Sequence, residues 1–349
     1  MTRKNTMKAS DIFGTEVPII QSPMAGVQDH QLAVAVSRGG GLGSIPCAML
    51  DTTRIEKELA AFRAQAVGPV NVNFFCHQAP IADEQRENRW RDTLQPYFKE
   101  YSIDAIPPAA ERKPFDLDAA DVIESFQPEI VSFHFGLPSA ELLARVKGWG
   151  ASVMSTATTI EEACWLEAHG ADIIIAQGYE AGGHRGMFLS SDLTTQAGTL
   201  ALLPQVVRSV SVPVVAAGGI ADSQGVMAAL SMGAIAVQMG TAYLLCDEAL
   251  TSTVHRAALK SENSVHTAIT NIFSGRPARS IVNRVIREIG PISDLAPQFP
   301  LAATAISALR NAAEQGESGD FSPLWSGQNT SGCAEVSASQ LTRELANRD

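Results

Sequence analysis

Eight short apolar runs recur along the 349-residue chain, and they constrain its fold more than any other feature. The runs are rich in β-branched residues, and most of them end in Gly, Ser, Asn or Gln. Continuous apolar runs of this length are typical of strands buried on both faces, as in a parallel sheet. The runs cover residues 17–24, 41–46, 70–75, 130–136, 151–157, 172–178, 212–219 and 234–241.

Segments with helical spacing separate these runs. Residues 139–150 and 158–170 are two examples, and in the second Thr159 and Glu162 have the spacing of a capping box. Eight strands that alternate with helices predict a (β/α)8 TIM barrel. An open doubly wound sheet is the structural alternative. Its best candidate for a dinucleotide turn, the glycine-rich residues 39–44, does not begin a helix.

Two parts of the chain exceed a minimal barrel. Residues 77–122 are predicted to be an insertion after the third strand, with a charged stretch and a proline-broken middle. Residues 246–349 are predicted to be a mostly helical C-terminal extension. We expect the two to pack together as a helical cap over one end of the barrel, which leaves residues 1–76 and 123–245 to form the barrel itself.

Composition narrows the choice of partners. The formal net charge of −11 argues against nucleic acid or an anionic membrane, since phosphate binding draws on basic patches. The N-terminus lacks the apolar core of a signal peptide, and no apolar stretch approaches the roughly 18 residues of a transmembrane helix. Five widely spaced cysteines predict reduced, buried thiols. We therefore expect a cytoplasmic protein with small-molecule partners, either monomer or homodimer.

The stretch "GYEAGGHRG", Gly178 to Gly186, follows the sixth run and contains four glycines, one glutamate and one histidine. So many glycines indicate that the backbone comes close to something flat or anionic, although a long flexible loop is the plain alternative. Barrel enzymes hold their active sites at the C-terminal ends of the strands. His184 is therefore the candidate catalytic group.

The seventh and eighth runs also end in glycines. In TIM barrels these two positions commonly bind phosphate through backbone N–H groups and the start of a short helix. Two ordinary strand-to-helix turns are the alternative for either motif alone. The candidate phosphate-binding residues are Gly218, Gly219, Gln238, Met239, Gly240 and Thr241.

Other catalytic signatures are missing from the sequence. Metal binding is not predicted, because no histidine has an acid at ligand spacing except His184 with Glu180, and these two are not on a helix. A Gly-x-Ser-x-Gly nucleophile motif and a P-loop are also absent. Amides, glycines and a histidine suit a protein whose cofactor carries the difficult chemistry.

Seven segments, taken in order, resemble the nitronate monooxygenase family, formerly called 2-nitropropane dioxygenases, and within it the bacterial class I type. They are "PIIQSPMAGV", "NVNFFCH", "SFHFGLP", "AQGYEAGGHRG", "VVAAGGI", "AVQMGTAYL" and "SGRPAR". The resemblance covers nearly the whole chain. It implies an FMN-dependent barrel that oxidises alkyl nitronates with O2 to a carbonyl compound and nitrite, with propionate 3-nitronate and neutral nitroalkanes as candidate substrates.

The same resemblance implies roles for particular residues. His184 would take a substrate α-proton or steady the nitronate charge, and His134 would face the same pocket. A core histidine bonded to a carbonyl is the alternative for His134. Glycines 182 and 183 would let the backbone approach the flavin. The implied FMN contacts, besides the phosphate-binding residues, are Pro23, Met24, Ala25, Asn71, Gln177, Gly182 and Gly183.

Two other functions remain open at this stage. FMN-dependent enoyl-acyl-carrier-protein reductases share the "EAGGH" loop and the barrel, but they use NAD(P)H. A flavin-binding protein without turnover is the alternative of a different class. The segment "FPLAATAISALR", residues 299–310, carries no tyrosine where we expect some relatives to have them, and this leaves the substrate open.

Overall fold

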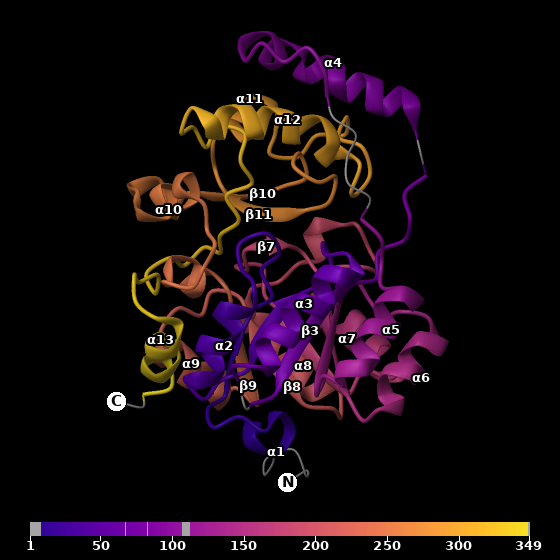
Figure 1. Ribbon diagram of the computed structural model, residues 1–349, viewed down its shortest axis with the longest axis vertical. Helices are drawn as coiled ribbons and strands as arrows, with labels where there is room; N and C mark the ends of the chain where they lie inside the picture. Colours follow the sequence, from indigo (N-terminus) through magenta and orange to yellow (C-terminus); the bar gives the residue numbers. More distant parts are fainter. Residues whose placement is uncertain (1–7, 67, 82, 107–111, 348–349) are drawn as a thin grey trace.

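The computed structural model describes residues 8–66, 68–81, 83–106 and 112–347. Its parallel strands form one eight-stranded sheet in the order β1-β9-β8-β6-β5-β4-β3-β2. A parallel bridge between Ile20 of β1 and Leu42, just before β2, joins the two ends of that order. The sheet therefore closes into the predicted TIM barrel (Figure 1).

Each barrel strand lies within one of the eight predicted runs. The strands are β1 (Ile19–Gln21), β2 (Gly43–Pro46), β3 (Val70–Phe75), β4 (Ile130–His134), β5 (Ser152–Ala157), β6 (Ile173–Gln177), β8 (Val214–Ala217) and β9 (Ala236–Met239). Helices surround them, and the side chains of Ser139 and Thr159 cap α6 and α7. The predicted capping box of α7 is not completed, because the Glu162 carboxylate accepts from the N–H of Thr158 at 2.7 Å and not from that of Thr159. The surrounding helices are α2 (His30–Arg38), α3 (Thr52–Arg63), α5 (Leu117–Phe126), α6 (Ala140–Gly148), α7 (Ile160–Ala168), α8 (Thr199–Ser209), α9 (Ser223–Ser231) and α13 (Ala338–Leu345).

The barrel interior changes character along its axis. Its floor is apolar and includes Ile20, Met154 and Val215, which pack with Phe13 of α1 (Ala9–Phe13). Above the floor lie buried polar side chains, among them Gln21, Ser44, Asn71, Ser132 and Ser155. The apolar end stabilises the fold, and the polar end lies toward the cap.

The cap forms where the insertion meets the C-terminal extension, as predicted. In the insertion, α4 (Glu84–Glu100) packs against α12 (Ala302–Gln315), and the buried Trp90 donates from Nε1 to the carbonyl of Ala302 at 3.2 Å. Figure 1 shows α4 lying across the cap beside α12. The other cap helices are α10 (Thr253–Lys260) and α11 (Arg284–Ile289).

The prediction of a mostly helical extension missed a small antiparallel sheet. Strands β10 (Thr267–Thr270) and β11 (Ala278–Ile281) pair with each other, and β11 also pairs with β7 (Gly183–His184). Because β7 belongs to the glycine-rich loop, this sheet fastens the loop to the cap. Strands this short carry little periodicity, and the pairing joins residues about ninety positions apart.

Further expectations concern the insertion boundary, the proline-broken middle of the insertion and the cysteines. The insertion boundary drawn at residue 122 falls inside α5, which packs with α3 and α6 in the barrel layer. Residues 107–111, the proline-broken middle, and the N-terminal residues 1–7 lie outside the described residues. All five cysteines are free thiols, but Cys164 is exposed, so the expectation of buried thiols is wrong there. None of the described helices is long and apolar enough to cross a membrane.

Candidate active site

A cavity of about 310 Å³ lies where the C-terminal ends of the barrel strands meet the cap. This volume is at the lower end of the range of small-molecule sites. Residues from the ends of β6, β8 and β9 line the cavity, together with residues of α12 and of the segment 321–329. The predicted site residues on its wall are Pro23, Met24, Ala25, His134, Gln177, Gly182, Gly183, His184, Gly218, Gly219, Gln238, Met239, Gly240 and Thr241.

Asn71 is the predicted site residue that does not line the cavity. Val70 and Val72 of β3 pack in the outer core, so Asn71 and Asn73 both point into the barrel. Asn73 lies nearer the strand end and lines the cavity, whereas Asn71 is one inward position deeper and donates to Ser44 Oγ at 2.9 Å. Sequence alternation gives the inward face of a strand but not the depth of each residue. Asn71 Oδ1 is buried without a partner among the described residues.

The glycine-rich loop is held by its own neighbours. Gln177 donates from Nε2 to the carbonyl of His184 at 3.0 Å and accepts the N–H of Gly186 at 2.8 Å. Both polar atoms of this amide, which the resemblance assigned to the flavin, therefore already bind the loop. The fully buried Arg185 adds hydrogen bonds to the carbonyls of Gln177 and Gly178. These contacts fix the backbone on both sides of His184.

The glycines of this loop mostly serve packing within the protein. A Cβ on Gly182 would lie 2.5 Å from the backbone nitrogen of Gly327, and one on Gly186 would lie 2.5 Å from the side chain of Thr156. Gly183 has open space on that side, but its φ of +69° favours glycine. The contact of Gly182 with a flavin stays a prediction, and the structure adds a second reason for a glycine at this position. Gly182 admits the chain segment that crosses above it.

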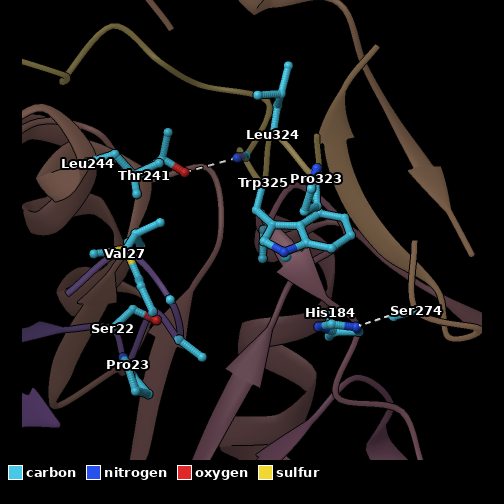
Figure 2. A pocket seen from close by; sticks show the side chains of 18 of the residues that line it. Ser22, Pro23, Val27, His184, Thr241, Leu244, Ser274, Pro323, Leu324 and Trp325 are labelled. Atoms are coloured by element: carbon cyan, nitrogen blue, oxygen red, sulfur yellow. Dashed lines mark hydrogen bonds between the residues drawn. The ribbon is translucent and has the colours of Figure 1, made fainter. Parts of the chain in front are cut away.

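That segment, residues 321–332, is called the strap below. Its Gly327 donates from the backbone to Thr241 Oγ1 at 2.9 Å, and Asn329 donates to the carbonyl of Gly219 at 3.2 Å. Figure 2 shows the contact to Thr241 and places Trp325 of the strap near His184. The strap thus covers the glycine-rich ends of β8 and β9.

His184 lies in an aromatic enclosure. The rings of Phe75, Phe135, Phe299 and Trp325 have their centres 5.4–6.4 Å from that of His184. Burial holds the pKa of His184 well below its usual range, and the positive charges of Arg112 and Arg276 act in the same direction. The imidazole is therefore neutral at physiological pH.

Ser274 forms a hydrogen bond with His184. Its Oγ lies 2.8 Å from His184 Nε2 and 3.3 Å from the carbonyl of Arg276. Which of the two atoms donates in the shorter contact depends on the tautomer of His184. When the Ser274 hydroxyl donates to the carbonyl of Arg276, His184 donates from Nε2, and its Nδ1 is unprotonated and able to accept a proton.

His134 supports the backbone of His184. Its Nε2 lies 3.2 Å from the carbonyl of His184, and its Nδ1 lies 3.1 Å from Thr156 Oγ1. Burial lowers the pKa of His134 to about 3, so its ring is neutral. Both ring nitrogens are engaged with the protein, as expected of the core-histidine alternative, although the ring also lines the cavity.

The opposite end of the cavity contains the candidate phosphate-binding residues. Gly218 and Gly219 have φ values of +107° and +74°, which favour glycine at both positions. Gln238 contributes a buried Oε1 without a partner among the described residues. After β9 the chain enters a short 3-10 helix, Thr241–Leu245.

A cluster of possible metal ligands lies outside this cavity, at Asp29, His30 and Glu58. Glu58 is 2.7 Å from both His30 Nδ1 and Arg54 Nε, and Asp29 caps α2. Glu58 and Asp29 therefore already have hydrogen-bond partners within the protein. Glu180, the acid near His184 in sequence, instead accepts from the backbone and hydroxyl of Thr199 at the start of α8.

A model of the family described as nitronate monooxygenase matches residues 6–348. The chain belongs to the nitronate monooxygenase family. A nitronate monooxygenase of Pseudomonas aeruginosa is 40% identical over 97% of this chain and 98% of its own length. Another, of Paraburkholderia phytofirmans, is 40% identical over 96% of this chain and 92% of its own. This member of the family is accordingly an oxidoreductase.

Solved structures agree with the sequence comparison. A nitroalkane oxidase from Streptomyces ansochromogenes superposes with a TM-score of 0.88 at 37% identity, covering 97% of this chain and 96% of its own. FabK from Thermotoga maritima has a TM-score of 0.73 at 26% identity, covering 99% of this chain and 96% of its own. The barrel and cap are thus shared with both proteins.

Sequence reasoning missed several residues of the site in this family member. Ser274, Arg276 and Arg279 belong to the segment "SGRPAR", which was matched as a motif without a physical role. Arg276 stacks its guanidinium 3.9 Å from the ring centre of Phe135, and Arg279 donates to the carbonyl of Tyr179. The two arginines close to a serine in this short segment were the sequence feature that could have indicated a role in the site. The cavity also takes in Ser22, Asn73, Arg112 and Trp325.

Proposed function

We propose that this protein is an FMN-dependent enzyme that oxidises alkyl nitronates with O2, releasing a carbonyl compound and nitrite. Propionate 3-nitronate is the leading candidate substrate. The observation that carries the proposal is a buried, neutral His184 on the cavity wall, with the positive charges of Arg112 and Arg276 acting on its imidazole. Family membership supplies the class of reaction.

The residues at the strand ends fit FMN. A phosphate would be held by backbone N–H groups of Gly218, Gly219 and Gly240, together with the start of the 3-10 helix. The unpartnered Oε1 of Gln238 offers an acceptor to a ribityl hydroxyl, and Asn71 Oδ1 is a second unpartnered acceptor in the polar layer below. The cofactor would supply the redox chemistry, and the protein would position the substrate and move its proton.

The charges around His184 favour an anion over a neutral molecule. Arg112 and Arg276 both act on this imidazole, and no carboxylate is among the charges that shift its pKa. The aromatic enclosure strengthens these interactions, because charges attract one another more strongly in a low-dielectric site. A nitronate, which is already anionic, is therefore favoured over the corresponding nitroalkane.

Neutral nitroalkanes require one further step. Their α-proton must be removed, and Nδ1 of His184 is the base available to accept it. The hydrogen bond from Nε2 to Ser274 stabilises the imidazolium that would result. Nitroalkane oxidation is thus within reach of the same site, with proton removal as the added barrier.

Parallel assays of purified holoenzyme test the proposal. We expect non-covalent FMN in the protein, oxygen consumption with propionate 3-nitronate and ethyl nitronate, and nitrite in the product mixture. Rapid oxidation of NADH without any response to nitronates would instead favour an enoyl reductase. Bound flavin with no turnover of either kind would favour a non-catalytic flavin protein.

A further inference from the structure

Trp325 is the tryptophan of the strap, and its indole ring lies on the wall of the cavity. The centre of this ring is 5.4 Å from that of His184 and 5.5 Å from that of Phe273. In Figure 2 the indole nitrogen lies on the edge of the ring nearer to His184. The candidate base and the indole N–H can therefore reach the same small molecule.

Backbone hydrogen bonds hold this indole in place. The carbonyl of Leu324 accepts from the N–H of Ile281 at 2.9 Å. The N–H of Ser326 donates to the carbonyl of Arg279 at 3.3 Å. Both partners belong to β11, so the backbone on either side of Trp325 is fixed to the cap sheet. A donor that is already in position loses little entropy when it binds a ligand.

The indole N–H of Trp325 has no hydrogen-bond acceptor in the part of the chain that the structure describes. Trp90 donates its own indole N–H to the carbonyl of Ala302 at 3.2 Å. Trp149 likewise donates to the carbonyl of Pro128 at 3.2 Å. An indole N–H inside a protein usually finds such a partner. At Trp325 the N–H faces a cavity instead, where a ligand oxygen would serve as its acceptor.

Removing the α-proton of a nitroalkane moves negative charge onto the nitro group. The C–H bond breaks, its proton goes to the imidazole of His184, and its electron pair forms the C=N bond of the nitronate. One N–O oxygen then carries the negative charge. A hydrogen-bond donor aimed at that oxygen lowers the barrier, because it binds the oxygen more strongly as the charge develops. The low-dielectric aromatic enclosure strengthens the effect.

We propose that the indole N–H of Trp325 donates to an oxygen of the nitro group and stabilises the negative charge that forms there when His184 removes the α-proton. This inference rests on the proposed function and deepens its nitroalkane step. Among the four rings of the aromatic enclosure, only the tryptophan carries a polar hydrogen. The base and the donor would thus act on neighbouring atoms of one substrate.

Removing the N–H while keeping the ring tests the assignment. The analogue 3-benzothienylalanine has sulfur in place of the indole N–H and nearly the same shape, and nonsense suppression can place it at position 325. We expect kcat/KM for nitroethane to fall about 10²–10³-fold, the usual loss for one donor to a developing oxyanion. With preformed ethyl nitronate the charge leaves these oxygens during oxidation, so the loss should stay within about 10-fold.

Two further variants complete the kinetic test. Trp165→Phe is the matched control, because Trp165 lies on α7 outside the cavity, stacked on His169 with ring centres 3.8 Å apart. It should leave kcat/KM for both substrates unchanged. Trp325→Phe removes the N–H together with one ring and should lose at least as much on nitroethane as the analogue does. Equal losses on nitroethane and ethyl nitronate in the analogue would show that the N–H has no special role in proton removal.

Isotope exchange separates this inference from the proposed function. Anaerobic holoenzyme in D2O, with nitroethane in large excess, should exchange the α-hydrogen faster than the spontaneous reaction does, and NMR measures this rate. Exchange needs the base and the donor but neither oxygen nor the release of nitrite. We expect the analogue to exchange about 10²–10³ times more slowly than the wild type.

The outcomes are distinct. Exchange that depends on the N–H, with no oxidation of any nitro compound, would remove the proposed function and keep the role of Trp325. Exchange at the wild-type rate in the analogue would overturn that role. Wild-type protein that neither exchanges nor oxidises nitroethane would overturn it as well, because no negative charge then forms at this site.

Discussion

The hydroxyl of Ser274 bears on which nitrogen of His184 is free to accept a proton. When it donates a hydrogen bond to the carbonyl of Arg276, it accepts one from Nε2 of the histidine and leaves Nδ1 unprotonated. The sequence pointed to His184, because a lone histidine among glycines at a strand end is unusual. It did not point to Ser274, which follows ninety residues later and reaches the site through the pairing of β7 with β11.

Replacing His184 should distinguish the two kinds of substrate. In His184→Asn we expect kcat/KM to fall by about 10²–10⁴ on a neutral nitroalkane, the usual range for general acid–base assistance. The preformed nitronate of the same compound has already lost the proton and should be affected less. Stopped-flow or steady-state assays on both forms, at equal FMN occupancy, measure the difference. Equal activity of variant and wild type on both forms would leave this histidine without a catalytic role.

The sequence also did not predict how deep each inward-facing residue lies within the barrel. Asn71 and Asn73 alternate correctly for the inward face, but the wall of the cavity begins above Asn71. Arg112 was passed over because it lies in a charged, proline-rich stretch that resembles a surface loop. Its burial depends on the cap closing over it, which is a tertiary effect.

At the scale of elements, the strap depends on two glycines that face each other. A Cβ on Gly182 would meet the backbone of Ser326 and Gly327, and one on Gly327 would lie 2.9 Å from the carbonyl of Glu180. The barrel strands were predictable because each is a continuous apolar run. The strap and the β7–β10–β11 sheet were not, since they are short, polar in part and held by distant partners.

Gly182→Ala should therefore loosen the strap. We expect the variant to fold but to release flavin faster than wild type, measured by the rise in flavin fluorescence after dilution. Gly148→Ala in the last turn of α6 is the matched control, because its Cβ meets nothing within 4 Å and the residue lies outside the cavity. Similar release rates in the two variants would show that steric contact with the strap does not retain the cofactor.

For the whole molecule, buried neutral histidines link stability to pH. Burial lowers the pKa of His134 to about 3 and that of His255 to about 4, and it holds that of His184 well below its usual range. The unfolded chain binds protons at these positions below about pH 6.5, whereas the folded protein does not. The stabilisation linked to these neutral histidines is therefore complete above pH 6.5. Below that pH the free energy of unfolding falls as the pH drops toward 4.

Urea unfolding of the holoenzyme between pH 7.5 and 5 measures this effect. Each of the three histidines should contribute up to about 1.4 kcal/mol per pH unit below 6.5. His255→Asn should reduce the pH dependence of the free energy of unfolding by about the contribution of one histidine. Excess FMN at every pH serves to keep cofactor binding constant. An unfolding midpoint that stays level from pH 7.5 to 5 would contradict the account.

The strap has a consequence for how the protein is made. All eight barrel strands leave the ribosome before residues 321–332, and about 80 residues separate the end of β9 from the strap. At roughly 5–20 residues per second, that interval is on the order of 4–16 s. During it the nascent barrel has no cover over its glycine-rich end. We expect the proposed FMN to reach this open end of the barrel more easily during the interval than after residues 321–332 have covered it.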